Sequence, residues 1–479
     1  MQKRNVVLLI ITLVAITAGF FLYLYFFPQA KPVVNNPDVT SQNFFPFGNT
    51  PKKNTPTGPA NISGLGILNP LTGDGGSTNT LPIKKISSFP IAGFGIYNKE
   101  VFSNIPAVVN TTTPQTLPLS GEGVNTTTTN TTTQPPDKGA KGVVLKTTKP
   151  IKPTPPPTEL ITMVRYINKE NGNIYQTPAD TITETKYTNT IIPKIYEGLF
   201  VSNTKTVVMR YLNIDNKTIE SYLGILPVEV LGGDGTGTNE IKGSFLPQNI
   251  IDMSISPDNS NIFYLFKNAS NNDSSIIGTT AGAQGDKKTQ IFSSAFTGWL
   301  SQWPNAKIIT LTTKPAADYP GYMYSIDPNK KDFNKILGGI NGLTTLTSPS
   351  GADVLYNNST NGGLDLNIYH INSGNSDKLS IKTLPEKCVW TKANDAIYCA
   401  VPRFLDNAKY PDAWYKGLIS FGDEIWKIDV TNLNAKKISD PLQVAGEEVD
   451  GIKLTLDDNE KYLFFMNKKD NYLWELKTI

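Results

Sequence analysis

The chain of 479 residues contains one histidine and two cysteines, and this scarcity limits its chemistry. A finger-type zinc site needs four Cys or His ligands, so that class of protein is excluded. Only one imidazole, that of His370, is available for acid–base catalysis. A charge excess is also missing, because 44 Lys and Arg are balanced by 41 Asp and Glu. Nucleic-acid binding, which depends on a basic surface, is therefore not expected.

Known catalytic signatures are missing as well. The sequence has no Gly-x-Ser-x-Gly elbow, no sialidase-type box and no Gly-rich loop that opens a helix. Gly232–Gly237 is rich in glycine but joins two expected strands, and its single carboxylate, Asp234, is weak evidence for a cation site. His370 occupies a variable position of the repeat described below, which favours a solvated strand residue over a catalytic base. We therefore expect no catalytic residue, no metal and no cofactor.

One long apolar run is present near the start. Val6 to Phe27 carries no charge and is long enough to cross a hydrocarbon core of ~30 Å. Its end, Phe20 to Phe27, is too bulky for signal-peptidase cleavage and suits a membrane interface. Lys3 and Arg4 favour a cytoplasmic N-terminus. We predict a cytoplasmic stub at 1–5, a transmembrane signal anchor at 6–27 and an extracytoplasmic remainder.

Two stretches have the composition of disordered chain. Residues 28–82 are rich in Pro, Asn, Thr and Gly, and residues 103–157 include the run Asn125-Thr-Thr-Thr-Thr-Asn130. Neither stretch has enough apolar side chains to offset the entropy of ordering. We predict a linker at 28–82 and a low-complexity insert at 103–157 within a folded part that spans 83–479.

The rest of the chain shows a repeated strand pattern. An apolar–aromatic–variable–apolar motif recurs, with a weaker copy at Ile174-Tyr175-Gln176-Thr177. The four clear copies are Met323-Tyr324-Ser325-Ile326, Ile368-Tyr369-His370-Ile371, Ile425-Trp426-Lys427-Ile428 and Leu473-Trp474-Glu475-Leu476. A repeat of roughly 40–50 residues with several strands per unit is typical of a β-propeller.

A second signal lies in the turns. Ser256-Pro257-Asp258-Asn259 separates two strand-like runs and resembles the Ser-Pro-Asp-Gly turn of WD40-like Pro-Asp repeats, as in TolB-type propellers. The Gly-His and Trp-Asp pairs of true WD40 blades are absent. The resemblance implies an architecture and says almost nothing about function.

Seven units can be counted. Their inner strands are expected to begin near Phe89, Ile192, Ile250, Trp299, Leu343, Cys388 and Ile452. The last unit lacks its outermost strand, and Lys84-Lys85-Ile86-Ser87 repeats Lys436-Lys437-Ile438-Ser439 of the sixth unit. We therefore predict an all-β, seven-bladed propeller whose last blade is completed by residues 83–88 pairing with 471–477, with the insert leaving the first blade. The alternative is a sandwich of two stacked sheets.

Cys388 and Cys399 flank a hairpin turned at about Ala393-Asn394. In that register the two cysteines face each other at disulfide distance. An extracytoplasmic position permits oxidation, so we predict a Cys388–Cys399 disulfide. The alternative is a pair of buried thiols.

One segment interrupts the strand pattern. Between Val401 and Ser420 it holds the candidate binding residues Arg403, Tyr410, Trp414, Tyr415 and Lys416. Aromatic side chains with Arg are enriched at binding hot spots. The alternative is that these aromatics fold back and cap the propeller.

Three functions are compatible with these features. The first is a membrane-tethered scaffold that binds an envelope protein or wall glycan, in what looks like a bacterial cell. The second is an envelope glycan hydrolase or lyase, which requires two carboxylates converging within roughly 5–10 Å. The third is a surface component whose insert makes the contacts. We prefer the scaffold function, because the spacing of Asp and Glu in the sequence predicts no converging carboxylate pair.

Overall fold

The computed structural model describes residues 81–103, 156–229, 231, 239–268, 275–360 and 362–478. The predicted anchor at 6–27, nearly all of the linker and most of the insert lie outside these residues. Within the described ranges, no helix combines the length and the apolar character that a membrane crossing requires.

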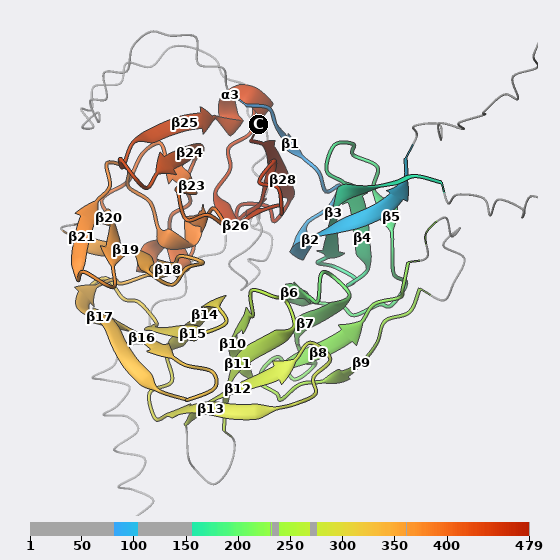
Figure 1. The fold of residues 1–479 in the computed structure, drawn as a ribbon, viewed down its shortest axis with the longest axis horizontal. Helices are drawn as coiled ribbons and strands as arrows, with labels where there is room; N and C mark the ends of the chain where they lie inside the picture. The colour runs from blue at the N-terminus through green and yellow to red at the C-terminus, as the bar shows by residue number, and fades with distance from the viewer. Residues whose placement is uncertain are drawn as a thin grey trace, which may run out of the picture. The chain divides into compact units, whose positions relative to one another are not determined.

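The described part is a ring of seven four-stranded antiparallel sheets (Figure 1). We number the blades by their inner strands, which are β2 (Ile91–Phe102), β6 (Ile195–Val201), β10 (Ile250–Ile255), β14 (Trp299–Asn305), β18 (Thr345–Thr347), β22 (Cys388–Trp390) and β26 (Gly451–Leu456). The second strands are β3 (Thr158–Asn168), β7 (Thr206–Leu212), β11 (Asn261–Lys267), β15 (Ile308–Thr313), β19 (Asp353–Thr360), β23 (Ala396–Pro402) and β27 (Tyr462–Asn467). The third strands are β4 (Ile174–Pro178), β8 (Ile219–Ile225), β12 (Ile276–Gly282), β16 (Pro320–Ile326), β20 (Gly363–His370), β24 (Asp423–Asp429) and β28 (Leu473–Lys477). The outer strands are β5 (Thr185–Lys186), β9 (Lys242–Phe245), β13 (Thr289–Ser294), β17 (Phe333–Asn341), β21 (Asn375–Lys378), β25 (Ala435–Ser439) and, in blade 7, β1 (Ile83–Lys85).

The seven-unit count is confirmed and the sandwich alternative is wrong. The inner strands start within three residues of the expected positions, and three of the predicted starts, at Ile250, Trp299 and Cys388, coincide with the observed ones. The repeated aromatic motif falls on the third strand of its blade, as in β16 and β28. The motif recurs in the third strand because the apolar side chains of this strand pack against a neighbouring blade.

Ring closure follows the predicted pairing. β1 pairs with β28, with Ile83 opposite Leu476 and Lys85 opposite Trp474. Just beyond β1, the backbone N–H of Ile86 donates to Leu473 at 2.8 Å. A strand from the beginning of the propeller thus covers an edge that blade 7 would otherwise expose.

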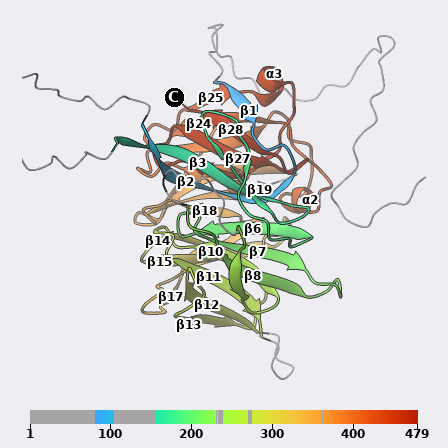
Figure 2. The ribbon, with the colours of Figure 1, turned by 90° about the vertical axis from the view of Figure 1, so that its right-hand side faces the viewer.

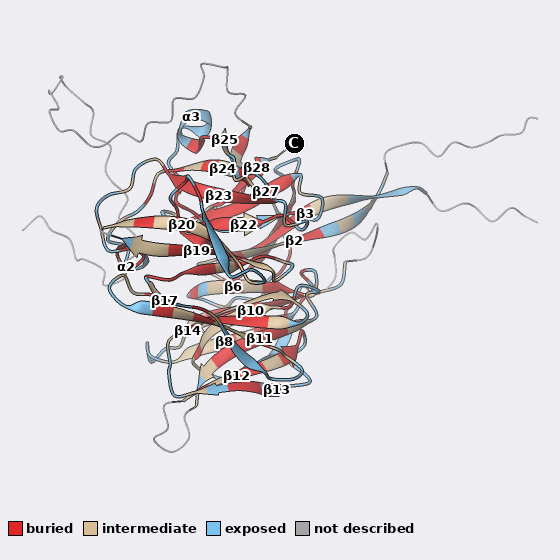
Figure 3. Cartoon of the chain, turned by 60° about the vertical axis from the view of Figure 1, so that its left-hand side comes forward, coloured by how far each residue is buried: buried red, intermediate tan, exposed pale blue. Residues whose placement is uncertain are grey.

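Buried apolar side chains fill every junction between blades. In the described part of the chain, each of the seven neighbouring pairs of blades shares one cluster, including blades 7 and 1. The blade 7–blade 1 cluster joins Tyr462 and Phe464 of β27 to Ile91 and Val164. Figure 3 shows this burial as red along the middle of the strands. Each fully buried large side chain contributes about 1.5–3 kcal/mol relative to exposure, so the junctions hold the ring together.

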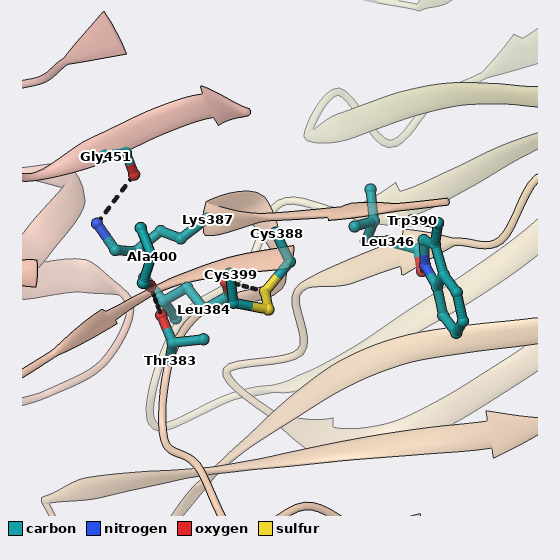
Figure 4. The surroundings of a disulfide bond; sticks show 9 residues. All are labelled: Leu346, Thr383, Leu384, Lys387, Cys388, Trp390, Cys399, Ala400 and Gly451. Atoms are coloured by element: carbon teal, nitrogen blue, oxygen red, sulfur yellow. Dashed lines mark hydrogen bonds between the residues drawn. A yellow bond between two sulfur atoms is a disulfide. The ribbon is translucent and has the colours of Figure 1, made fainter. Parts of the chain in front are cut away.

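The predicted disulfide is present. Cys388 and Cys399 are paired across β22 and β23, with their Cα atoms 4.1 Å apart. Figure 4 shows the bond directly after Lys387, and Cys388 Sγ also lies 3.8 Å from the carbonyl oxygen of Leu384. The disulfide therefore fixes the start of blade 6 at the base of the 403–422 segment.

We expect the paired change Cys388→Ala and Cys399→Ala to lower the free energy of unfolding by about 2–3 kcal/mol, because the bond closes a short loop. Urea denaturation of the oxidised protein measures this difference. The matched control is the wild-type protein in reductant, which should lose a similar amount, while the double variant should not respond to reductant. If reductant lowers the stability of the wild-type protein and of the double variant equally, the predicted contribution of the Cys388–Cys399 disulfide is wrong.

Candidate binding face

The segment 403–422 connects the second and third strands of blade 6. It carries one helical turn, α2 (Asp412–Tyr415), as the sequence suggested. It contacts other blades: its Ala408 N–H donates to the carbonyl oxygen of Gly362 at 3.1 Å, and its Asp412 carboxylate accepts the N–H of Ala317 at 2.6 Å. Gly362 and Ala317 lie in the second-to-third-strand connections of blades 5 and 4. The segment thus spans several blades on one face of the ring.

An aromatic cluster lies beneath the segment. Tyr410, Trp414 and Phe421 are buried together with Leu364 and Leu384. The rings of Trp414 and Phe421 stack at 6.2 Å, and those of Tyr410 and Phe421 at 6.0 Å. Tyr410 is only 1% exposed and Trp414 4%, so both side chains support the segment from inside.

Asp450, just before β26, is the polar centre of this support. Its carboxylate accepts hydrogen bonds from Trp414 Nε1 at 3.0 Å, from Ser420 Oγ at 3.1 Å and from the Phe421 N–H at 3.1 Å. It also pairs with the ammonium of Lys387. One carboxylate therefore joins blade 7, blade 6 and the segment.

Lys387 holds a second carboxylate as well. Its Nζ lies 2.7 Å from Asp423 Oδ2 and 3.0 Å from the carbonyl oxygen of Gly451, and all of these side chains are buried. Burial raises the pKa of Asp423 to about 6. Burial opposes ionisation of Asp450 too, but the charge and hydrogen bond of Lys387 hold its pKa below the ordinary value. The Lys387–Asp450 ion pair is thus the charged pair that fixes the segment.

The other three sequence candidates lie closer to solvent. Arg403 pairs with Asp440 at the start of α3 (Pro441–Ala445), and with Glu424 at 3.7 Å. Tyr415 is 37% exposed and donates its hydroxyl to Glu386 in η1 (Pro385–Lys387). Lys416 is exposed. The five candidates therefore share a segment but do not form one surface cluster.

A cavity of about 400 Å³ opens between α2 and the turn at 316–319 of blade 4. Its lining residues are Ala316, Ala317, Asp318, Tyr319, Lys409, Asp412, Ala413, Lys416 and Leu418. Tyr319 is 72% exposed and Leu418 74%. This cavity could not be predicted from the sequence, because its two walls come from segments about ninety residues apart.

The cavity lies on the face opposite the root of the insert. The insert interrupts the connection between the first and second strands of blade 1, whereas α2 lies in a second-to-third-strand connection. In an antiparallel blade these two kinds of connection lie at opposite ends of the strands, and therefore on opposite faces of the ring. Figures 2 and 3 show the far end of the β2–β3 hairpin and α2 on opposite sides of the ring.

A charged network near the ring centre was missed by the sequence interpretation. Lys453 of β26 lies 3.5 Å from Glu197 of β6, which also pairs with Arg210. Asp252 of β10 accepts hydrogen bonds from the Ser301 backbone N–H and hydroxyl, at 2.5 and 2.7 Å. These residues come from blades 7, 2, 3 and 4. Only an alignment of the seven inner strands with one another would have suggested that they lie near each other.

Local backbone features make these contacts possible. A β-bulge in β26, with Lys453 at φ 55°, redirects the lysine. Gly93 of β2 lies against Gly198 of β6 so closely that a Cβ on Gly93 would be 2.0 Å from the Gly198 carbonyl oxygen. Blades 1 and 2 therefore pack closely along their inner strands.

The two central carboxyl groups differ in ionisation. Burial, together with the charge of Glu197, raises the pKa of Asp252 to about 7. Burial also disfavours ionised Glu197, but Lys453 and Arg210 hold its pKa below the ordinary value. Near neutral pH, Asp252 therefore retains a proton for part of the time, while Glu197 is ionised.

We expect the Asp252→Asn variant to reveal this difference through its pH dependence. The folded-state pKa of Asp252, about 7, lies above its unfolded value of about 3.9, so its contribution to stability is present at pH 4 and is lost as the pH rises through 7. Wild type should therefore lose stability relative to the variant between pH 4 and 8. Urea midpoints at pH 4, 6 and 8 measure this.

The matched control is Asp258→Asn. Hydrogen bonds from Ser256 and Ser260 lower the pKa of Asp258, so its contribution should stay constant above about pH 5. A wild-type–Asp252→Asn difference that is flat from pH 4 to 8 would contradict the assignment.

His370 lies apart from both sites. Its Nδ1 is 2.7 Å from Asp353 and its Nε2 is 3.0 Å from Asp377, and these hydrogen bonds raise its pKa. The Gly-rich stretch at 232–237 lies outside the described residues.

The fold and these sites define the class of the molecule, a seven-bladed β-propeller of the architecture that the Pro-Asp turn predicted. No family model matches the chain, and no curated protein matches it.

Some solved structures are similar to this chain at low identity. TolB from Acinetobacter baumannii is 12% identical over 65% of this chain and 61% of its own, with a TM-score of 0.35. An oligogalacturonate lyase in complex with manganese is 8% identical over 66% of this chain and 85% of its own, with a TM-score of 0.42. Hydrazine synthase from Kuenenia stuttgartiensis is 11% identical over 66% and 92%, with a TM-score of 0.41. This chain thus spans about three fifths of the TolB chain, and the likeness concerns the fold alone.

Proposed function

We propose that this protein is a binding scaffold of the cell envelope, and that its contact surface is the face bearing α2. The anchor at 6–27 tethers it to the membrane with a cytoplasmic N-terminus, and the propeller lies outside the cytoplasm. The partner is an envelope protein or a wall glycan.

One observation carries the binding role: exposed apolar side chains stand on a rigid buried support. Phe404, Leu418 and Tyr319 are 77%, 74% and 72% exposed on this face. Beneath them, the stacked aromatic rings and the Asp450 carboxylate fix the segment. Exposed apolar groups that are held in place mark interaction sites, because little ordering entropy is lost on binding.

The test is capture of partners from envelope extract by the full-length protein. The double variant Tyr319→Ala/Leu418→Ala should lose the captured partner at least tenfold. The control is Leu160→Ala, because Leu160 is 71% exposed on the hairpin of the opposite face. Equal capture by all three proteins would overturn the α2 face as the contact surface.

The second candidate function, an envelope glycan hydrolase or lyase, is favoured by the central carboxyl groups. Burial raises the pKa of Asp252, whereas Lys453 and Arg210 lower the pKa of Glu197, and two carboxyl groups with pKa values shifted apart are what acid–base cleavage of a glycan uses. Reducing ends released from peptidoglycan or polygalacturonate by the full-length protein measure this activity. If the wild-type protein releases reducing ends and both Asp252→Asn and Glu197→Gln abolish the release, the enzymatic function is supported. If the wild-type protein releases none from either polymer, the scaffold function is favoured.

A further inference from the structure

Four of the nine residues that line the cavity beside α2 have apolar side chains: Ala316 and Ala317 from the blade 4 turn, and Ala413 and Leu418 from the 403–422 segment. These side chains offer neither donors nor acceptors. A polar group of a ligand placed against them would lose its hydrogen bonds to water and gain none in return. These residues therefore favour an apolar side chain over the hydroxyls of a sugar.

Four charged residues line the cavity: Asp318, Lys409, Asp412 and Lys416. Lys409 forms an ion pair with Asp318. Asp412 keeps its negative charge, and its Oδ2 accepts the backbone N–H of Ala317 at 2.6 Å, which ties the two walls together. Among the described residues, Lys416 has no carboxylate within ion-pair distance, and it is exposed. The cavity thus presents one unpaired ammonium beside apolar side chains.

These features complement a specific kind of occupant. We propose that the cavity binds a segment of a partner protein in which an apolar side chain stands next to Asp or Glu, with the apolar group against the lining alanines and the carboxylate paired to Lys416. This inference rests on the proposed scaffold function and narrows the partner to a protein.

The walls are organised before binding. The bond from Ala317 to Asp412 joins the blade 4 turn to α2, and Trp414, two residues further along α2, donates a hydrogen bond to Asp450. Because both walls are fixed, the occupant would meet little reorganisation cost. A volume of about 400 Å³ lies at the small end of ligand cavities, which suits one or two side chains.

The experiment is a selection of random twelve-residue peptides on phage against the immobilised full-length protein. Enriched peptides should contain an aromatic or Leu residue adjacent to Asp or Glu. Lys416→Glu should weaken the binding of a synthetic enriched peptide at least tenfold, and replacing the peptide's acidic residue with Lys should restore binding to that variant. The control Lys392→Glu changes an exposed lysine far from the cavity, paired with Asp458, and should leave the affinity unchanged.

Three outcomes overturn the inference: enriched peptides without acidic residues, affinity indifferent to Lys416→Glu, or binding of uronate oligosaccharides in place of peptides. Capture of partners from envelope extract distinguishes a wrong acidic-peptide inference from a wrong scaffold function. If Tyr319→Ala/Leu418→Ala abolishes capture while Lys416→Glu preserves it, the binding face stands and the acidic partner is wrong. If neither variant affects capture, the scaffold face itself is wrong.

Discussion

Shortening Ile83 to alanine is expected to lower the free energy of unfolding by about 2–5 kcal/mol. Ile83 is 6% exposed in the cluster between blades 6 and 7, together with Leu463 and Trp474. It also lies in the three-residue strand that completes blade 7. The change therefore creates a cavity at the point where the ring closes. Urea denaturation followed by tryptophan fluorescence measures the loss.

The control for this prediction is Leu160→Ala. Leu160 lies in β3 but is 71% exposed, so its truncation should change stability by less than about 0.5 kcal/mol. Similar losses for the two variants would show that β1 contributes no more to the fold than an exposed position does.

Replacing Asp450 with alanine should cost about 3–5 kcal/mol, the range for breaking a buried charge pair. The change removes one of the two carboxylates on Lys387 and leaves the indole N–H of Trp414 and the backbone N–H of Phe421 without their acceptor. Asp450→Asn should cost less, because an amide oxygen still accepts hydrogen bonds. We also expect a red shift of tryptophan emission in Asp450→Ala as Trp414 becomes solvated.

Asp458→Ala is the matched control for this second prediction. Asp458 pairs with Lys392, but both side chains are more than 60% exposed, so the pair should contribute less than about 1 kcal/mol. An Asp450→Ala variant as stable as Asp458→Ala, with unchanged emission, would refute the role of Asp450 as the support of the binding face.

The blade pattern could be predicted because its signals are local. The aromatic motif, the Pro257-Asp258 turn and the missing last strand all lie within short stretches of chain. The matching Lys84-Lys85-Ile86-Ser87 segment even identified the strand that closes the ring. The disulfide was predictable for the same reason, since a tight hairpin fixes which residues of its two strands face each other.

The candidate site was less predictable. A segment without strand or helix periodicity does not reveal which side chains point inward, so Tyr410 and Trp414 were indistinguishable from Tyr415 in the sequence. Lys387 and Asp450 are 63 residues apart and belong to different blades. Nothing in either local sequence indicates the partner.

The sequence by itself determined the repeat, the number of blades, the strand that closes the ring and the cysteine pair, because each depends on alternation and register between neighbouring segments. Only the tertiary structure decided which aromatics are buried, which carboxylate holds the 403–422 segment, and which charges meet at the ring centre. These depend on contacts between different blades, where closing the ring brings together residues that share no local pattern.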